Sequence, residues 1–296
     1  MKQNKIACWV EAMRLRTLPV SIAGVILAIG LAVSTNSFQS IPAVLCLVFA
    51  ILAQIASNFG NEYYDYKDGL DAPGREGPRR GVTEGDITPR AMLVATYATL
   101  AAACVVGCSL IAFGGWWLLP IGMVIALGAI AYSAGPYPLS RHGLGEITVI
   151  AFFGIVPVTL TYYVQALAFP VEVWLSGVAA GLMGANVLIV NNYRDADADA
   201  AVGKYTLAVI LGRKAVRFIY LLNGIVAAAI MMPLWTGMSA SAVIAIPLLY
   251  LTGHLALWLS MPRKKGHALT PILAATSMLM LFYCAGFTVA ISFWGV

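Results

Sequence analysis

The side chains of this chain that are best suited to chemistry are acids and amides, and they gather in two short stretches. In the first stretch they are spaced by three or four residues: Asn58, Asn61, Asp65 and Asp68. A helix that continues to Gly69 would present them as one polar stripe. Carboxylates crowded at a helix end repel one another unless cations lie between them. Carboxylate and amide oxygens suit Mg²⁺, which binds one or two carboxylates together with substrate phosphates.

The second stretch repeats an asparagine followed four residues later by an aspartate. Asn191 and Asp195 stand in the same relation as Asn61 and Asp65, and Asp199 shares a helix face with Asp195. We interpret the repeat as a degenerate internal duplication, which would place two similar helix ends opposite one another across a central cavity. Two facing carboxylate sets can clamp one diphosphate through bridging metal. Nearby basic residues are candidates for neutralising the remaining phosphate charge, namely Arg79, Arg80, Arg194 and Lys204.

Two plainer interpretations of these stretches compete with a metal site. The charges could belong to solvated loops that only mark a membrane boundary. Alternatively, Asp195, Asp197 and Asp199 resemble the start of a calcium-binding EF-hand loop. In that loop, however, Ala200 would occupy the glycine position and Thr206 the terminal glutamate position. On a helix, Asp197 would point away from its two neighbours.

The composition predicts that the rest of the chain is embedded in lipid. Of 296 residues, 60% are hydrophobic and 10% are charged, against about 25% charged in a soluble domain. Apolar runs of about 17 to 25 residues span a bilayer, and a lipid-exposed backbone must be helical to satisfy its own hydrogen bonds. Nine such segments are expected, at about Leu18–Val33, Ile41–Phe59, Ala91–Phe113, Trp116–Ser133, Ile147–Gln165, Val173–Val190, Phe218–Trp235, Ala242–Met261 and Pro271–Trp294.

The orientation follows from the loops, because Lys and Arg residues near segment ends are retained in the cytoplasm. All 18 Lys and Arg residues, Lys2 and Arg75 among them, lie on one side of this threading. We therefore expect an all-α integral membrane protein with nine transmembrane helices around a central cavity, a cytoplasmic N-terminus and an external C-terminus. Residues 1–296 would form a single domain with cytoplasmic catalytic loops at about 60–90 and 191–217, which hold ten of the 13 carboxylates.

Several further motifs accompany the two acidic stretches. They are Arg14-Leu-Arg16-Thr-Leu-Pro19, Gly77-Pro-Arg79-Arg80-Gly81, Gly135-Pro136-Tyr137-Pro138-Leu139, Gly143-Leu-Gly145-Glu146 and Asn191-Asn-Tyr-Arg194-Asp195 through Gly203-Lys204. Together they resemble the UbiA-type intramembrane aromatic prenyltransferases over nearly the whole chain. The resemblance is strongest to the branch that prenylates 1,4-dihydroxy-2-naphthoate in menaquinone biosynthesis. The sequence departs from the family pattern where Glu62 replaces the usual aspartate, and Asp71 lies six residues beyond Asp65.

The resemblance implies a reaction, a cofactor and a location. A polyprenyl group would pass from polyprenyl diphosphate to 1,4-dihydroxy-2-naphthoate with loss of CO₂ and diphosphate, giving demethylmenaquinone. Mg²⁺ would be the cofactor, and the active site would face the cytoplasm from the bacterial inner membrane. The net charge of +5 requires no nucleic acid partner, because a basic rim suits anionic membrane lipid.

The resemblance also assigns roles to individual residues. Catalytic roles fall to Asp65, Asp195, Asp199 and Lys204. The metal ligands would come from Asn61, Glu62, Asp65, Asp68, Asp71, Asn191, Asp195 and Asp199. The substrates would be contacted by Asn58, Arg79, Arg80 and Arg194.

Four more residues are candidates for binding the acceptor or the allylic cation. Arg14 and Arg16 would meet the carboxylate of the acceptor, unless they serve only as topology anchors. Tyr132 and Tyr137 would flank the cation or the naphthalene ring, unless they are ordinary interfacial aromatics.

Other functions also fit parts of the pattern. Within the family, the acceptor could be 4-hydroxybenzoate, homogentisate or a porphyrin-derived acid. A secondary transporter is an alternative of a different class, but it would place charged sites near the middle of the membrane.

Overall fold

The computed structural model describes residues 4–71, 77–235 and 238–294. Lys2 and Arg75, which contributed to the predicted orientation, lie outside these ranges, as does Glu76. Within them the chain is helical throughout, apart from turns and one isolated bridge between His142 and Tyr205.

The helices follow the apolar runs of the sequence, as expected for a backbone that must satisfy its own hydrogen bonds in lipid. In chain order they are α1 Lys5–Ala12, α2 Leu18–Ser34, α3 Ser40–Lys67, α4 Pro89–Ser109, α5 Ile111–Gly114, α6 Leu118–Ala131, α7 Gly145–Val149, α8 Val156–Ala166, α9 Val171–Ala201, α10 Leu207–Met231, α11 Ala240–Ser260 and α12 Thr270–Trp294. A π-helix at Ile150–Ile155 joins α7 to α8. Four 3₁₀ turns lie at Leu139–Arg141, Met232–Trp235, Met261–Arg263 and Gly266–Leu269.

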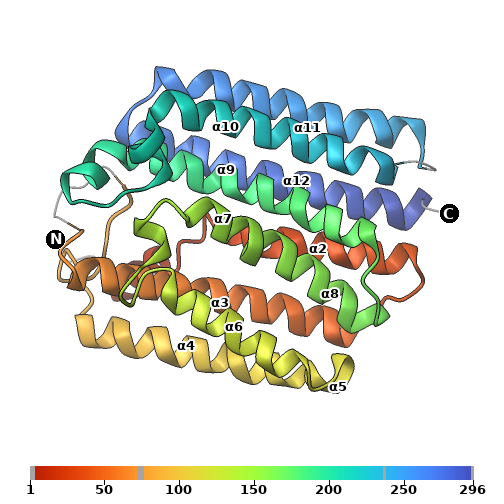
Figure 1. Cartoon of the computed structure of the whole chain (residues 1–296), viewed down its shortest axis with the longest axis horizontal. Coiled ribbons are helices and arrows are strands. Elements are labelled where there is room, and N and C mark those ends of the chain that lie inside the picture. Colours follow the sequence, from red (N-terminus) through yellow and green to blue (C-terminus); the bar gives the residue numbers. More distant parts are fainter. Residues whose placement is uncertain (1–3, 72–76, 236–237, 295–296) are drawn as a thin grey trace.

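Each of the nine predicted segments falls on a helix. Seven helical stretches of the described residues are long and apolar enough to cross a membrane, and two shorter apolar helices, α2 and α6, coincide with the remaining segments. The helices lie side by side along the long axis of the molecule (Figure 1). The all-helical architecture is therefore as predicted.

The predicted catalytic loop at about 191–217 is wrong in its secondary structure. Helix α9 continues past the apolar run to Ala201, and α10 begins at Leu207, so only five residues connect the two helices. The polar end of α9 stays helical because its acids are paired with basic side chains, as described below. Helix α3 likewise extends past Phe59 to Lys67.

Helix α9 lies in the middle of the bundle, where it packs on α10, α12, α8 and the π-helix. In the most apolar window of α9, 72% of the residues are buried, against 17% for the stretch that contains α4. Gly154 of the π-helix contacts the backbone of Gly181 and of Gly177 so closely that a Cβ atom at Gly154 would collide with both. Small residues allow such close helix contacts in membrane proteins.

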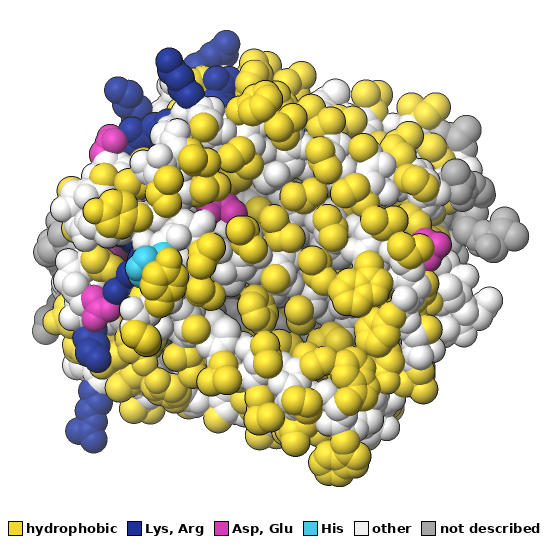
Figure 2. All heavy atoms as spheres, viewed as in Figure 1, with side chains coloured by type: hydrophobic (Ala, Val, Ile, Leu, Met, Phe, Trp, Pro, Cys, Tyr) yellow, Lys and Arg dark blue, Asp and Glu magenta, His cyan; other side chains and the backbone are white. Residues whose placement is uncertain are grey.

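Charged side chains gather at one end of the bundle. Figure 2 shows a largely hydrophobic face, with Lys and Arg side chains at the end where α9 meets α10. Helices α3 and α9 both end there, since Lys204 contacts carboxylates from both. A hydrophobic belt with a polar end is the surface that a bilayer requires.

Candidate active site

The polar stripe predicted on α3 forms. Asn58, Asn61 and Asp65 are buried, whereas the Asp68 side chain is 40% exposed. The Asn61 amide nitrogen donates to Asp65 Oδ2 at 3.1 Å and to Ser133 Oγ at 3.2 Å. Asn61 therefore fixes the Asp65 carboxylate relative to the segment that follows α6.

The end of α3 is a Schellman motif, the common helix ending in which a left-handed residue folds the chain back onto the last turn. Gly69 has φ +72°, which favours glycine. The amide of Leu70 donates to the Asp65 carbonyl at 2.8 Å, and the amide of Gly69 donates to the Tyr66 carbonyl at 3.1 Å. The chain turns at Gly69 and folds back onto Asp65, whose carbonyl accepts the hydrogen bond that closes the turn.

Helix α9 ends in the same way. Gly203 has φ +71°, the amide of Lys204 donates to the Asp199 carbonyl at 2.9 Å, and the amide of Gly203 donates to the Ala200 carbonyl at 3.2 Å. Asp199 therefore occupies the position in α9 that Asp65 occupies in α3. Because the chain reverses direction at Gly203, the Lys204 side chain lies over the end of α9.

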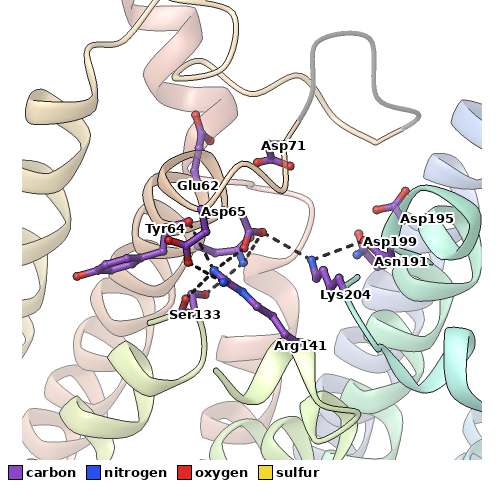
Figure 3. A network of polar contacts seen from close by, with 12 residues as sticks. Glu62, Tyr64, Asp65, Asp71, Ser133, Arg141, Asn191, Asp195, Asp199 and Lys204 are labelled. Atoms are coloured by element: carbon purple, nitrogen blue, oxygen red, sulfur yellow. Dashed lines mark hydrogen bonds and ion pairs between the residues drawn. The ribbon is translucent and has the colours of Figure 1, made fainter. Parts of the chain in front are cut away.

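Lys204 joins the two acidic clusters. Its ammonium lies 3.6 Å from Asp65 Oδ2 and 3.8 Å from Asp199 Oδ1 (Figure 3). The Lys204 and Asp65 side chains are 14% and 1% exposed, so solvent screens this contact weakly. The two helix ends consequently face one another, as the sequence predicted.

Arg80 binds the Asp65 side of the site. Its Nε lies 3.2 Å from Asp71 Oδ2, and its Nη2 donates to Asn61 Oδ1 at 3.1 Å. The guanidinium also lies 4.0 Å from carboxylate oxygens of Glu62 and Asp65. Arg14 donates to the same Asn61 oxygen at 2.5 Å. Both arginines therefore belong to the site.

Arg141 is a site residue that the sequence did not identify. It donates to Asp68 Oδ2 at 2.6 Å, to the Ser133 carbonyl at 3.1 Å and to Asp65 Oδ1 at 3.4 Å (Figure 3). In the sequence it is the one Lys or Arg residue between the fourth and fifth segments, and it lies outside both acidic stretches. Only the fold, which brings this loop against the end of α3, shows its role.

The second acidic cluster contains its own arginine. Arg194 Nε and Nη2 donate to the two carboxylate oxygens of Asp195 at 2.7 and 2.8 Å, and Nη2 also donates to Asn191 Oδ1 at 2.8 Å. Its Nη1 is buried and has no hydrogen-bond partner among residues 4–71, 77–235 and 238–294. As predicted, Asp197 points away, since its side chain is 87% exposed and pairs with Arg213.

Two residues proposed for the metal or substrate have other contacts. Glu62 Oε1 accepts the amide hydrogen of Val82 at 3.1 Å, and its carboxylate turns away from the contact between Asp65 and Lys204 (Figure 3). Glu62 thus holds the segment after residue 77 against α3. Asn58 donates to the Met13 carbonyl at 2.9 Å and accepts from Gln54, so it ties the N-terminal segment to α3.

Three further predicted site residues lie outside this network of contacts. Arg79 pairs with Asp86, and this carboxylate raises the pKa of the guanidinium above its usual value. Tyr137 is 56% exposed and stacks on His142, with ring centroids 3.7 Å apart. Arg16 is exposed and lines a separate cavity beside the start of α12. The contacts described for these three side chains are with residues other than Asp65 and Asp199.

An apolar cavity of about 270 Å³ begins beside the polar network. At one end its lining includes Gln54, Ser57 and Tyr132, and Tyr132 immediately precedes Ser133, the hydrogen-bond partner of Asn61. The remaining lining comes mainly from apolar residues of α3, α4, α6 and α8.

Glu146 is a second residue whose position the sequence did not reveal. Its side chain is buried, and Oε1 accepts from Asn192 at 2.9 Å. Its Oε2 is buried and has no hydrogen-bond partner in the part of the chain that the structure describes. The contact joins α7 to α9 one turn before Asp195. Its only sequence signal was membership of the Gly143–Glu146 motif.

The donor set fits Mg²⁺ that is shared with a phosphate ligand. No three His, Cys, Asp or Glu side chains converge into a metal-binding group within the described part of the chain. Asp65, Asp195 and Asp199 are instead neutralised by Lys204 and by arginines. Mg²⁺ commonly takes one or two carboxylates and completes its shell with waters and substrate phosphates. Such a site requires no preformed protein cage.

The architecture and site define a membrane-embedded helical protein with two acidic helix ends beside an apolar cavity. The model of the UbiA prenyltransferase family matches residues 22–282, and the chain belongs to this family.

Two relatives and one solved structure are similar to the chain. It is 37% identical over 217 residues to 1,4-dihydroxy-2-naphthoate octaprenyltransferase of Escherichia coli, covering 71% of this chain and 70% of the relative. It is 34% identical over 294 residues to the enzyme of that name from Mycobacterium tuberculosis, covering 97% of each. The structure of a UbiA homolog from Archaeoglobus fulgidus bound to GPP and Mg²⁺ superposes with a TM-score of 0.66 at 15% identity, covering 95% of this chain and 99% of the other, which shows a common fold.

Proposed function

We propose that this protein transfers a polyprenyl group from polyprenyl diphosphate to 1,4-dihydroxy-2-naphthoate, with loss of CO₂ and diphosphate. The relatives that carry the name of this activity support the choice of acceptor. The observation that carries the proposal is the position of Lys204 between Asp65 and Asp199. The apolar cavity reaches Tyr132, whose neighbour Ser133 binds Asn61 of the same network. A polyprenyl diphosphate has a charged head and a long apolar tail, so its binding site must join a polar region to an apolar one.

Asp65, Asp195 and Asp199 are the proposed holders of Mg²⁺, with Asn61 and Asn191 beside them. When bound, the metal neutralises charge that develops on the leaving diphosphate. Three basic side chains pair with carboxylates in the structure: Lys204, Arg80 and Arg141. The oxygens of a phosphate are negatively charged acceptors, like those of a carboxylate. These cations therefore hold the diphosphate at the helix ends.

The reaction needs one bond to break and one to form at the allylic carbon. The bond between this carbon and the diphosphate oxygen breaks, and the electron pair leaves with the diphosphate. A ring carbon of the acceptor supplies the pair for the new carbon–carbon bond, and release of its carboxylate as CO₂ restores the aromatic ring. The apolar walls of the cavity exclude water, which would otherwise trap the allylic cation.

The proposed topology has nine crossings in the bacterial inner membrane, with the N-terminus and the site in the cytoplasm and the C-terminus outside. The basic side chains at the site end of the bundle support this orientation. Reporter fusions after Gly69 and at the C-terminus would report opposite sides of the membrane if this topology is right.

The activity is tested with membranes that contain the protein, polyprenyl diphosphate and Mg²⁺, supplied with either 1,4-dihydroxy-2-naphthoate or 4-hydroxybenzoate. Mass spectrometry is expected to detect the decarboxylated prenyl naphthalenediol and no prenylated hydroxybenzoate. Prenylation of hydroxybenzoate alone would contradict the assigned acceptor. Membranes that contain the Asp65→Asn variant serve as the control for background enzymes.

A further inference from the structure

Helix α6 lines the apolar cavity with both small and large side chains. Gly122, Ala126 and Ala129 line the cavity and are spaced by four and three residues, which places them on one side of the helix. The neighbouring positions Val124 and Leu127 are 60% and 65% exposed and do not line it. Helix α6 therefore lies between the cavity and the surroundings of the protein, and its small residues Gly122, Ala126 and Ala129 widen the cavity between larger ones such as Ile121 and Ile125.

The space beside Gly122 is open. A Cβ atom added there meets no heavy atom of the described residues within 4 Å, whereas a Cβ atom at Gly128 would collide with the Phe152 ring. A methyl group fits at Gly122 without a clash, and because Gly122 lines the cavity, we expect a larger side chain there to occupy cavity space. Replacement of a helical glycine also improves helix propensity, so the substitution is compatible with folding.

The three small residues lie at graded distances from the polar end of the cavity. Tyr132 marks that end, and Ala129, Ala126 and Gly122 precede it by three, six and ten residues. At 1.5 Å of rise per residue, they lie about 4.5, 9 and 15 Å from Tyr132 along the helix axis. Substitutions at these three positions therefore probe the cavity at increasing distances from its polar end.

We propose that this face of α6 sets which prenyl tails the protein accepts, with Gly122, Ala126 and Ala129 keeping the channel open at successive distances from the reacting carbon. The inference rests on the proposed function, because it takes the cavity as the channel for the donor tail. One isoprene unit adds about 5 Å of extended length, since it contains four carbon–carbon bonds of about 1.5 Å in zigzag. A tail of two units ends before Gly122, and a tail of four or more passes it.

The test compares Gly122→Phe and Ala129→Phe with three donors: geranyl, geranylgeranyl and octaprenyl diphosphate. Gly122→Phe is expected to leave geranyl transfer within about twofold of the unmodified protein and to lower transfer of both longer donors by about tenfold or more. Ala129→Phe is expected to lower transfer of all three. Val124→Phe adds the same ring to the outward face and is the matched control, and Gly122→Ala controls for loss of glycine.

Two results would overturn the inference: an equal loss with all three donors in Gly122→Phe, or no loss with any of them. Val124→Phe must leave the donor profile unchanged. If the unmodified protein transfers none of the donors, the proposed function fails. Binding of the three diphosphates by titration calorimetry then makes the same comparison without turnover. A Gly122→Phe variant that binds geranylgeranyl and geranyl diphosphate with unchanged relative affinity contradicts the channel itself.

Discussion

Asp65 and Asp199 hold the same position in two helix ends that are far apart in the sequence. Each is the third residue from the end of its helix, and each carbonyl accepts the amide hydrogen of the residue that follows a left-handed glycine. A carboxylate in the last turn of a helix is disfavoured by the negative end of the helix dipole. Both acids are instead stabilised by cations, and Lys204 lies between them.

This pair of acids gives the first prediction. Asp65→Asn and Asp199→Asn are each expected to lower turnover by about a hundredfold or more, because each removes a charged oxygen at the site where the leaving diphosphate gains charge. Asp197→Asn, at an exposed position of the same helix, is expected to retain turnover. Steady-state rates on equal amounts of membrane-inserted protein provide the measurement. Equal effects of all three changes would contradict the assignment.

The glycines that end the two helices give the second prediction. Gly203→Ala forces a side chain into a left-handed conformation at a strain of about 1 kcal/mol, and relief of this strain would move Lys204 away from Asp65. We expect a modest loss of thermal stability together with a large loss of turnover. Gly85→Ala, at φ +76° in the turn before α4, is the matched control. It should show the same stability loss with normal turnover.

Arg141 gives the third prediction. Arg141→Gln keeps a donor for the Ser133 carbonyl but removes the charge beside Asp65 and Asp68. Because hydrogen bonds to charged groups contribute about 1.5–3 kcal/mol, the KM for the prenyl diphosphate should rise by about tenfold or more. The KM for the aromatic acceptor should change little. Arg263→Gln removes an exposed charge from the loop before α12 and should alter neither constant.

Glu62 gives the fourth prediction, which separates a structural from a metal-binding role. Glu62→Ala leaves the buried Val82 amide without its acceptor and should destabilise the fold by about 1–3 kcal/mol. Glu62→Gln retains an acceptor oxygen and should preserve both thermal stability and the Mg²⁺ concentration needed for half-maximal activity. A large rise in that Mg²⁺ concentration for Glu62→Gln would restore Glu62 to the metal site.

The paired charges at the site give the fifth prediction. The carboxylates are already neutralised by Lys204, Arg80 and Arg194. Mg²⁺ alone must therefore displace these basic side chains from the carboxylates. Diphosphate alone must displace the carboxylates from the basic side chains. Both ligands together satisfy both sets of charges. Thermal unfolding in detergent should therefore shift little with either ligand and by several degrees with both. An equally large shift with Mg²⁺ alone would contradict this account.

The sequence predicted the acidic pair but assigned its register differently. Matching Asn61 and Asp65 with Asn191 and Asp195 paired residues with the same spacing, whereas the structure pairs Asp65 with Asp199 through the glycines that follow them. The helix ending, which a pattern of acids does not specify, fixes this register. The apolar runs predicted the helices well because lipid leaves the backbone one way to satisfy its hydrogen bonds.

The remaining differences concern contacts between segments that are distant in sequence. Arg141 and Arg79 look alike in the sequence as loop arginines, yet Arg141 contacts Asp65 whereas Arg79 pairs with Asp86. Glu62 lies among the acids of the first motif, but its side chain leaves α3 on another face and binds the Val82 amide. Helix periodicity alone separates Asp197 from Asp195 and Asp199, and that prediction is confirmed.

The contact of Gly154 with Gly177 and Gly181 has a mechanical consequence. Since not even a methyl group fits between these backbones, α9 can neither slide nor rotate against the π-helix without opening a gap. The acids of α9 therefore extend from a helix that is mostly buried and closely packed, whereas few side chains of α4 are buried. A ligand that binds between α9 and α4 therefore contacts one closely packed helix and one that can shift more easily.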